Sequence, residues 1–394
     1  MRTRTLAILA AASLVLLALA VSLYTRRSTR FEAPAPKAIY PGLIDRVDEI
    51  TQIRIVSKDG EFHIDRDGDT WRMRERDGYP IRTEKIRAAV LTLSDLRVLE
   101  AKTSKPENYP ALGVQDPDAD APSVLVQMFD AKGDPLVSIV LGGVERSDMA
   151  SISRRYVRLT GDPRVYYIDG LAEVEPTLLR WIDREIFRMP RVWTHEIVIT
   201  HPDGETVRVF RPDPDTRNFA LADIPEGSAP VDERDINIIG NSFVYQGLED
   251  VASMKGVDES AVTPGPTAYA RTFDGMVMTA HLFDYDGATW VTFKASTTAP
   301  MQDVLDAYLA KAQAADPKTR NAPPPLRTAA EIAAEVDKDN AKLDGWRFRL
   351  TEDAIKHLSS RMSDLTHPAD EGEPATTDQP ATPPAPPAGD NPPG

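Results

Sequence analysis

The chain has 394 residues, 41% of them hydrophobic, which is enough for two or three domains with cores of their own. A formal net charge of −15 leaves no basic field to attract phosphates, which argues against nucleic acid as a partner. The absence of cysteine excludes disulfides, thiolate zinc sites, a cysteine nucleophile and lipid attachment to an N-terminal cysteine.

The N-terminal segment has the composition of a membrane-spanning helix. Residues 6–24 are apolar and uncharged, with arginines on both sides. A helix of this length matches a hydrocarbon core of roughly 30 Å. The alternative is a cleaved signal peptide, because residues 18–20 resemble a cleavage site, but such peptides usually have apolar regions of only about 7–15 residues. We therefore predict an anchor within residues 1–30, in the cytoplasmic (inner) membrane, with most of the chain periplasmic or otherwise extracytoplasmic.

Two further segments lack the composition of a folded core. Residues 31–44 contain three prolines and are expected to form an extended stalk. Residues 367–394 are rich in proline and contain no lysine, arginine or aromatic residue, so we predict a disordered tail.

The region between stalk and tail contains an internal duplication. Residues 53–64 and 197–208 both alternate apolar and polar positions around Asp-Gly-Glu, which predicts two β-hairpins with tight turns. A second match, between residues 122–130 and 266–274, has the same offset of 144 as the hairpins. The sequence thus predicts two α+β repeats, residues 45–190 and 191–366, with mainly antiparallel sheets.

Each repeat is expected to pack one helix against its hairpin. The apolar positions that predict these helix faces are Ile86, Ala89 and Leu93 in the first repeat and Ile236, Ile239 and Phe243 in the second. The first repeat is expected to close with a helix through Leu178, Leu179 and Ile182. The second has an insertion, residues 298–343, in which two alanine-rich helical runs flank a proline-rich stretch.

Several short motifs indicate a known family. The segment from Tyr109 to Pro117 (YPALGVQDP), the Leu-Gly-Gly at residues 141–143, the strand at 156–159 and Trp-Ile-Asp-Arg at 181–184 resemble the bacterial family called domain of unknown function 4340. The resemblance implies a membrane-anchored protein often encoded beside an ABC-type exporter and a gliding-motility-like auxiliary protein. It implies no catalytic residues. Pro110 stands where members commonly have glycine, and we expect the two glycines at 142–143 to form a turn.

Motifs for catalysis, cofactors and metals are absent from the sequence. The acidic segment 65–69 lacks the glycine and glutamate of a calcium loop and is interpreted as a hairpin turn, as is its counterpart at 213–215. None of the six histidines, which include His63 and His195, pairs at the spacing of a helical metal site. Nucleophile elbows and phosphate-binding loops are also missing. We predict no catalytic, cofactor-binding or metal-binding residues, and no cofactor.

Arginines near the end of the first repeat are the candidate interaction residues. Arg180, Arg184 and Arg188 are spaced to form one basic stripe if the segment is helical. Such a stripe could meet anionic headgroups or an acidic partner, although a solvated helix face neutralised by Asp183 and Glu185 is the more common case.

The leading functional hypothesis is an accessory or scaffold protein of the cell envelope, associated with an ABC-type transporter or its auxiliary protein. The alternative is an envelope hydrolase or carbohydrate-active enzyme whose carboxylates come together only in the fold. A third hypothesis is a structural spacer, which the stalk and the proline-rich tail suggest.

Overall fold

The structure is a computed structural model that describes residues 36–146, 153–172, 174–314 and 326–369. The predicted membrane segment, the start of the stalk and nearly all of the predicted tail lie outside these residues. Within the described ranges, no helix is long and apolar enough to cross a membrane. The chain divides into two compact units: the first extends to Glu75 and resumes at Pro80–Trp181, and the second comprises Arg76–Tyr79 and the chain from Ile182 onward.

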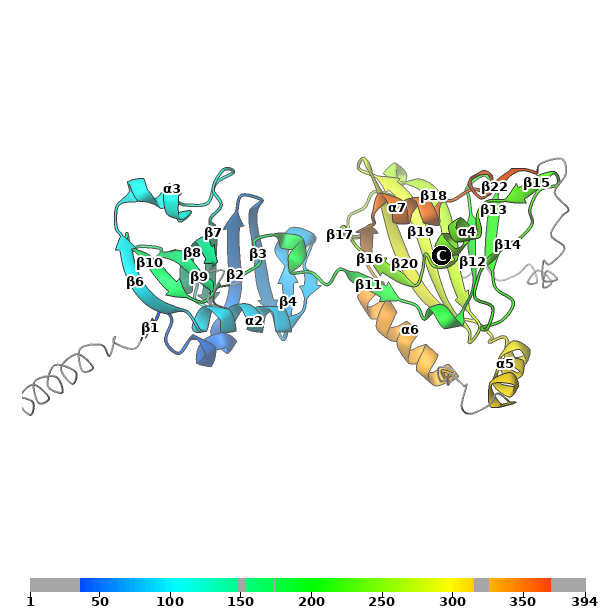
Figure 1. Cartoon of the computed structure of the whole chain (residues 1–394), viewed down its shortest axis with the longest axis horizontal. Helices are drawn as coiled ribbons and strands as arrows, with labels where there is room; N and C mark the ends of the chain where they lie inside the picture. The colour runs from blue at the N-terminus through cyan, green and yellow to red at the C-terminus, as the bar shows by residue number, and fades with distance from the viewer. Residues whose placement is uncertain (1–35, 147–152, 173, 315–325, 370–394) are drawn as a thin grey trace, which may run out of the picture. The chain divides into compact units, whose positions relative to one another are not determined.

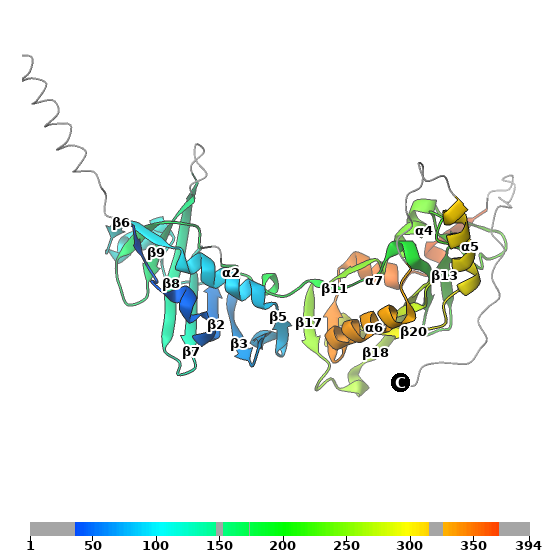
Figure 2. The ribbon, with the colours of Figure 1, turned by 90° about the horizontal axis from the view of Figure 1, so that it is seen from below.

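The first unit is built on one large antiparallel sheet with the order β1-β6-β10-β9-β8-β7-β2-β3-β4-β5. Helix α2 (Thr83–Ser94) crosses one face of this sheet (Figure 2) and buries Ile86, Ala89, Val90 and Leu93 against it. The elements in this unit are β1 (Lys37–Ala38), β2 (Ile50–Ser57), β3 (Gly60–Asp67), β4 (Thr70–Met73), β5 (Tyr79–Ile81), α2, β6 (Arg97–Thr103), α3 (Tyr109–Leu112), β7 (Val124–Asp130), β8 (Pro135–Arg146), β9 (Ser153–Leu159) and β10 (Val165–Asp169).

The second unit contains an eight-stranded sheet with the order β14-β13-β12-β18-β19-β20-β21-β17, and two ribbons, β11-β16 and β15-β22. Figure 1 labels its elements. They are β11 (Glu185–Arg188), β12 (Thr194–Thr200), β13 (Thr206–Phe210), β14 (Ala220–Leu221), β15 (Ser228–Pro230), α4 (Glu233–Gly240), β16 (Tyr245–Gly247), β17 (Asp250–Ser253), β18 (Thr263–Thr272), β19 (Met276–Tyr285), β20 (Ala288–Thr297), α5 (Gln302–Ala314), α6 (Ala329–Leu343), β21 (Trp346–Arg349), α7 (Glu352–Leu358) and β22 (Thr366–Pro368).

The two large sheets share a strand order. The run β6-β10-β9-β8-β7-β2-β3-β4 in the first has the same sequence of chain positions as β17-β21-β20-β19-β18-β12-β13-β14 in the second. In both, the first strand of the hairpin (β2 or β12) also pairs with a later strand (β7 or β18), and these pairings are all antiparallel. The predicted α+β class with mainly antiparallel sheets is confirmed.

Both predicted hairpins are present, and their glycines explain the turns. Gly60 between β2 and β3 has φ 115°, and Gly204 between β12 and β13 has φ 90°. Positive φ is accessible to glycine because it lacks a Cβ atom. The acidic segment 65–69 belongs to the β3–β4 hairpin, as expected: residues 65–67 end β3, and residues 68–69 form the turn, with Gly68 at φ 60°.

Helix α6 protects an open strand edge in the second unit. Strand β19 pairs with one edge of β20 at Ala295, but β21 pairs with the other edge only at Val291–Phe348. Among the described residues, that second edge therefore has no strand neighbour around Ala295. There the side-chain amide of Asn340 on α6 accepts from the Ala295 N–H and donates to its carbonyl, both at 2.9 Å. One amide side chain thus replaces a missing strand partner.

The closing helix expected through Leu178, Leu179 and Ile182 is wrong. A single 3-10 turn covers Leu178–Arg180, and the chain is extended again in β11 from Glu185. The boundary between the units falls between Trp181, which is buried in the first core, and Ile182, which belongs to the second unit. A continuous helix would have placed these two apolar side chains in one core. In the second unit, α4 ends at Gly240, so Phe243 is buried beyond the helix rather than on its face.

The turn expected at Gly142 and Gly143 is also wrong, because both lie within β8 at a register shift against β9. The backbone of residues 112–114 packs directly on them: a Cβ atom on Gly142 would lie 2.3 Å from a Val114 methyl and 2.8 Å from the Leu112 carbonyl. Arg158 also binds this loop: its Nε donates to the Val114 carbonyl at 3.0 Å, and its guanidinium pairs with Asp116. The family-like segments at 109–117, 141–143 and 156–159 therefore pack against one another.

Candidate functional site

A cleft of about 500 Å³ in the second unit lies between the ribbon strand β16 and helix α7. The end of α4 forms its third side. Its lining residues are Arg184, Ile238, Asn241, Ser242, Tyr245, Gln246, Gly247, Thr351, Asp353, Ala354 and His357. All belong to the second unit, so the cleft is complete within one folded body.

Two large apolar side chains at this cleft are exposed to solvent. The exposed fractions are 36% for Ile238 and 50% for Tyr245. The guanidinium of Arg188 lies 5.2 Å from the centroid of the Tyr245 ring, in cation–π contact. Isoleucine, tyrosine and arginine together match the composition of protein-binding surfaces, where tyrosine and arginine are enriched among the residues that contribute most energy.

The polar lining consists mostly of groups that can donate hydrogen bonds. Arg184 uses Nε to donate to the Leu248 carbonyl at 3.1 Å, but it has no carboxylate within ion-pair distance among the described residues. The hydroxyl of Ser242 is buried and lacks a hydrogen-bond partner there. Burial lowers the pKa of His357 from 6.5, so its imidazole is neutral at pH 7. The described lining thus offers hydrogen-bond donors, the guanidinium of Arg184, the carboxylate of Asp353 and two apolar contacts.

The three candidate arginines do not form a stripe. Arg180 ends the 3-10 turn in the first unit and is exposed, Arg184 lies in the loop that follows, and Arg188 is in strand β11. The helical spacing assumed for them fails because this segment is not a helix. Arg184 lines the cleft and Arg188 contacts the cleft residue Tyr245, whereas Arg188 also pairs with Glu185 at 2.7 Å. The structure therefore brings two of the three to one site.

Three residues of types used in nucleophilic catalysis also line the cleft, but they are not connected. Ser242, Asp353 and His357 all contribute to its walls. Within the described chain, no hydrogen bond joins Ser242 to His357, and no ion pair within 4.0 Å joins His357 to Asp353. A serine nucleophile needs a base in hydrogen-bond contact, and here that contact would require a movement of one of the side chains.

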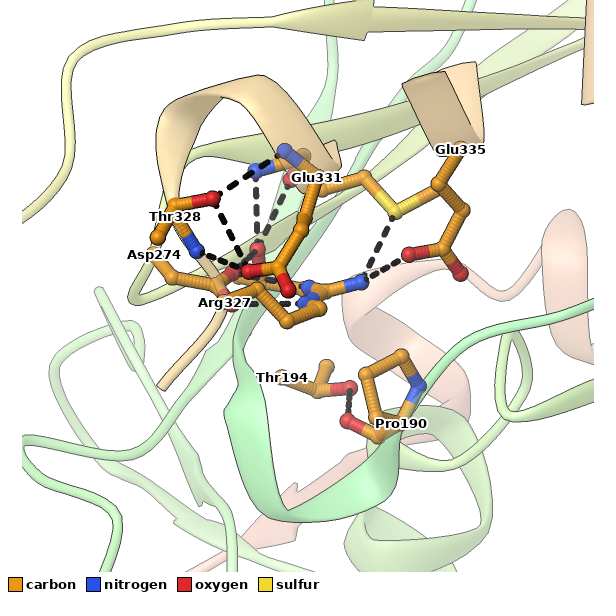
Figure 3. Close-up of polar contacts among 9 residues, drawn as sticks. Pro190, Thr194, Asp274, Arg327, Thr328, Glu331 and Glu335 are labelled. Carbon is orange, nitrogen blue, oxygen red and sulfur yellow. Dashed lines mark hydrogen bonds and ion pairs between the residues drawn. The ribbon is translucent and has the colours of Figure 1, made fainter. Parts of the chain in front are cut away.

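A second cleft, of about 390 Å³, lies beside a partly buried ion cluster (Figure 3). Arg327, directly before α6, donates from Nε and Nη2 to both carboxylate oxygens of Asp274, at 2.8 and 2.9 Å, and from Nη1 to Glu335 at 2.5 Å. Burial lowers the pKa of Arg327, but the hydrogen bond to Asp274 and the charges of both acids outweigh it, so the pKa is raised overall. The carboxylates of Asp274 and Glu335 are thus both hydrogen-bonded to Arg327.

This cluster fixes the start of α6 rather than presenting reactive groups. Thr328 caps the helix by accepting from the Glu331 N–H at 3.2 Å, while Glu331 accepts from the Thr328 N–H at 2.7 Å (Figure 3). Two carboxylates that share one guanidinium are poor candidates for a glycosidase pair, which needs one acid with a raised pKa.

The histidines singled out in the sequence have structural surroundings. His63 Nδ1 lies 2.9 Å from a carboxylate oxygen of Glu75, on the sheet of the first unit. His195 is 1% exposed, and its Nδ1 contacts the Arg211 carbonyl at 2.7 Å. Among the described residues, no group of three or more histidine and acidic side chains could hold a metal ion.

Sequence reasoning missed the cleft residues Ile238, Tyr245 and His357. Ile238 carried the only local signal, because it is an apolar residue outside the buried positions Ile236 and Ile239 of its helix. Tyr245 and His357 meet only through the packing of β16 and α7, which are more than 100 residues apart in the chain.

The chain thus forms an α+β protein of two antiparallel-sheet units, and the second unit has a cleft lined by both polar and apolar side chains. The family model described as domain of unknown function (DUF4340) matches residues 71–257. The resemblance seen in the sequence is thus confirmed over these residues. No curated protein and no solved structure matches the chain.

Proposed function

We propose that this protein is an accessory or scaffold protein of the bacterial cell envelope, anchored in the cytoplasmic membrane by residues 6–24 and associated with an ABC-type transport system. The described units would lie outside the cytosol, and they are two copies of one ancestral unit. The shared strand order of the two large sheets and the constant offset of 144 residues support the duplication. The apolar length of residues 6–24 supports the anchor.

The observation that carries the binding role is the cleft of the second unit. Its exposed Tyr245 and Ile238 stand beside Arg184, a cation without an ion-pair partner among the described residues. Such a surface buries apolar area and pairs a charge when a partner docks, which is how binding energy is concentrated in a few side chains. We assign the contact with the transporter or its auxiliary protein to this cleft.

Co-purification from native membranes tests this role. We expect Tyr245→Ala to reduce recovery of the partner by at least about tenfold, because loss of a central interface tyrosine typically costs 2 kcal/mol or more. Leu91→Ala is the matched control, since Leu91 on α2 is equally exposed, at 52%, but lies in the first unit. Equal recovery with both variants would reject the cleft as the docking site.

The anchor is tested separately by intact-mass measurement of the natively expressed protein. Retention of residues 1–30 and recovery in the membrane fraction are expected, because the apolar segment exceeds the usual length in a signal peptide. A mature chain that begins at Val21 would contradict the anchor while leaving the cleft unaffected.

A second candidate function is hydrolysis, which the presence of Ser242, His357 and Asp353 in one cleft favours. A fluorophosphonate probe, which labels activated serines, decides between the two. The accessory role predicts no labelling at Ser242, because no base among the described residues contacts its hydroxyl. Labelling that is lost in both Ser242→Ala and His357→Gln would establish the enzyme.

A further inference from the structure

Strand β16 has an edge that could accept another strand. Among the described residues it pairs with β11 alone, in a two-stranded ribbon. All three residues of β16, Tyr245, Gln246 and Gly247, line the cleft. The opposite wall is helix α7, through Asp353, Ala354 and His357. A groove between a strand edge and a helix has the geometry in which extended peptides add to a sheet.

The charged residues of the cleft indicate which charge a bound peptide should carry. Arg184 is exposed and has no carboxylate partner in the described chain. Asp353, the carboxylate of the lining, lies in the first turn of α7, where the partial positive charge of the helix end offsets part of its own. His357 is neutral at pH 7 because burial lowers its pKa. Of the described lining residues, Arg184 alone is cationic at pH 7, and its complement is a carboxylate.

We propose that the cleft binds an extended segment of a partner protein, which adds to β16 as a third strand, places an apolar side chain against Ile238 and Tyr245, and pairs a carboxylate with Arg184. This inference rests on the proposed binding role and names the occupant of the same site. Successive side chains of a strand point to opposite faces, so an apolar residue of the peptide and its acidic neighbour can contact different sides of the cleft.

The chain's own residues 370–394 are the competing occupant, since they contain five acids and no base. They also contain eight prolines. Proline has no N–H to donate to a neighbouring strand, so a sequence of this kind pairs poorly with a strand edge. For this reason we assign the cleft to a partner segment.

The test uses the full-length protein in detergent and a fluorescent hexapeptide, acetyl-Val-Thr-Val-Glu-Val-Thr-amide. Two further versions of the peptide carry N-methyl groups on alternate residues, one on the odd and one on the even positions. Each version lacks the backbone donors of one edge and keeps every side chain. We expect the unmodified peptide to bind, and one of the two N-methylated versions to bind at least about tenfold more weakly. Replacing Glu by Gln in the peptide should weaken binding by a similar factor.

A charge exchange locates the contact. Arg184→Glu should lose affinity for the Glu peptide by about tenfold or more and gain affinity for a peptide with Lys in place of Glu. Arg180→Glu serves as the matched control, because Arg180 is exposed and lies in the first unit.

Three results would overturn the inference. Wild-type protein that does not bind the unmodified peptide rejects it. Equal binding of both N-methylated peptides rejects strand addition, while the effect of Tyr245→Ala on co-purification still decides the proposed function independently. A chain truncated after Ala369 that binds the peptide at least tenfold more tightly than the full chain would assign the cleft to residues 370–394 instead of a partner.

Discussion

Arg327 and Asp274 form a bidentate pair, with Nε 2.8 Å from one carboxylate oxygen and Nη2 2.9 Å from the other. The side chain of Asp274 is only 2% exposed, and Thr272 also donates to it, at 2.5 Å. Removal of the guanidinium would leave a buried carboxylate without its counter-charge. Such losses typically cost about 3–5 kcal/mol of stability.

We therefore expect Arg327→Met to lower the free energy of unfolding by about 3 kcal/mol or more, measured by urea denaturation. Lys294→Met is the control, because the Lys294–Asp344 pair is more than half exposed and should contribute less than about 1 kcal/mol. Similar losses in the two variants would show that the buried cluster does not stabilise the second unit.

The contact between Gly142 and the loop at residues 112–114 predicts a large effect of one methyl group. Gly142→Ala would place Cβ 2.3 Å from Val114 and 2.8–2.9 Å from two carbonyl oxygens. We expect the free energy of unfolding to fall by about 2–3 kcal/mol, because the backbone must shift to relieve the overlap. Gly143→Ala, whose Cβ would have its nearest neighbour 3.3 Å away, should cost clearly less, with the free energy of unfolding of both variants measured by urea denaturation.

Burial of His195 predicts a pH dependence of stability. Burial lowers its pKa to about 4, whereas the unfolded imidazole titrates near 6.5. Between these values the unfolded state binds more protons, so stability is lost as pH falls. We expect wild type to lose about 2 kcal/mol more than His195→Gln between pH 7 and pH 5, measured by urea unfolding at each pH. Parallel losses in both proteins would contradict a buried neutral His195.

The positions of the candidate arginines predict unequal effects of charge reversal. Arg184→Glu should reduce partner recovery from membranes by at least about tenfold, whereas Arg180→Glu should leave it unchanged, because only Arg184 lines the cleft. Circular dichroism of both variants checks that the units stay folded. Equal losses would instead indicate a general electrostatic attraction of this segment.

Local patterns predicted the parts of the fold that depend on neighbouring residues. The hairpins around Gly60 and Gly204 follow from alternation and turn chemistry. Helix α2 follows from the spacing of Ile86, Ala89 and Leu93. In segment 298–343, where alanine-rich runs indicated helices, the structure has α5 and α6.

Features that depend on distant contacts could not be predicted in this way. The segment after Leu178 had a helical spacing of apolar residues, yet Trp181 and Ile182 belong to different units. Arg211 is a charged residue with an exposed fraction of only 2%, because the carbonyls of Arg191, Thr194 and Thr216 accept from it. The cleft brings Tyr245 to α7, and no motif records a contact across that separation.

Site-specific photo-cross-linking in cells is the most direct test of partner binding at the cleft. A benzophenone side chain at Ile238, which is exposed in the cleft, should yield one discrete adduct with a membrane transporter or its auxiliary protein. The same group at Leu91, exposed on α2 in the first unit, should yield none. Absence of an adduct at Ile238, or the same adducts at both positions, would contradict the central claim that this cleft is where the protein binds its partner.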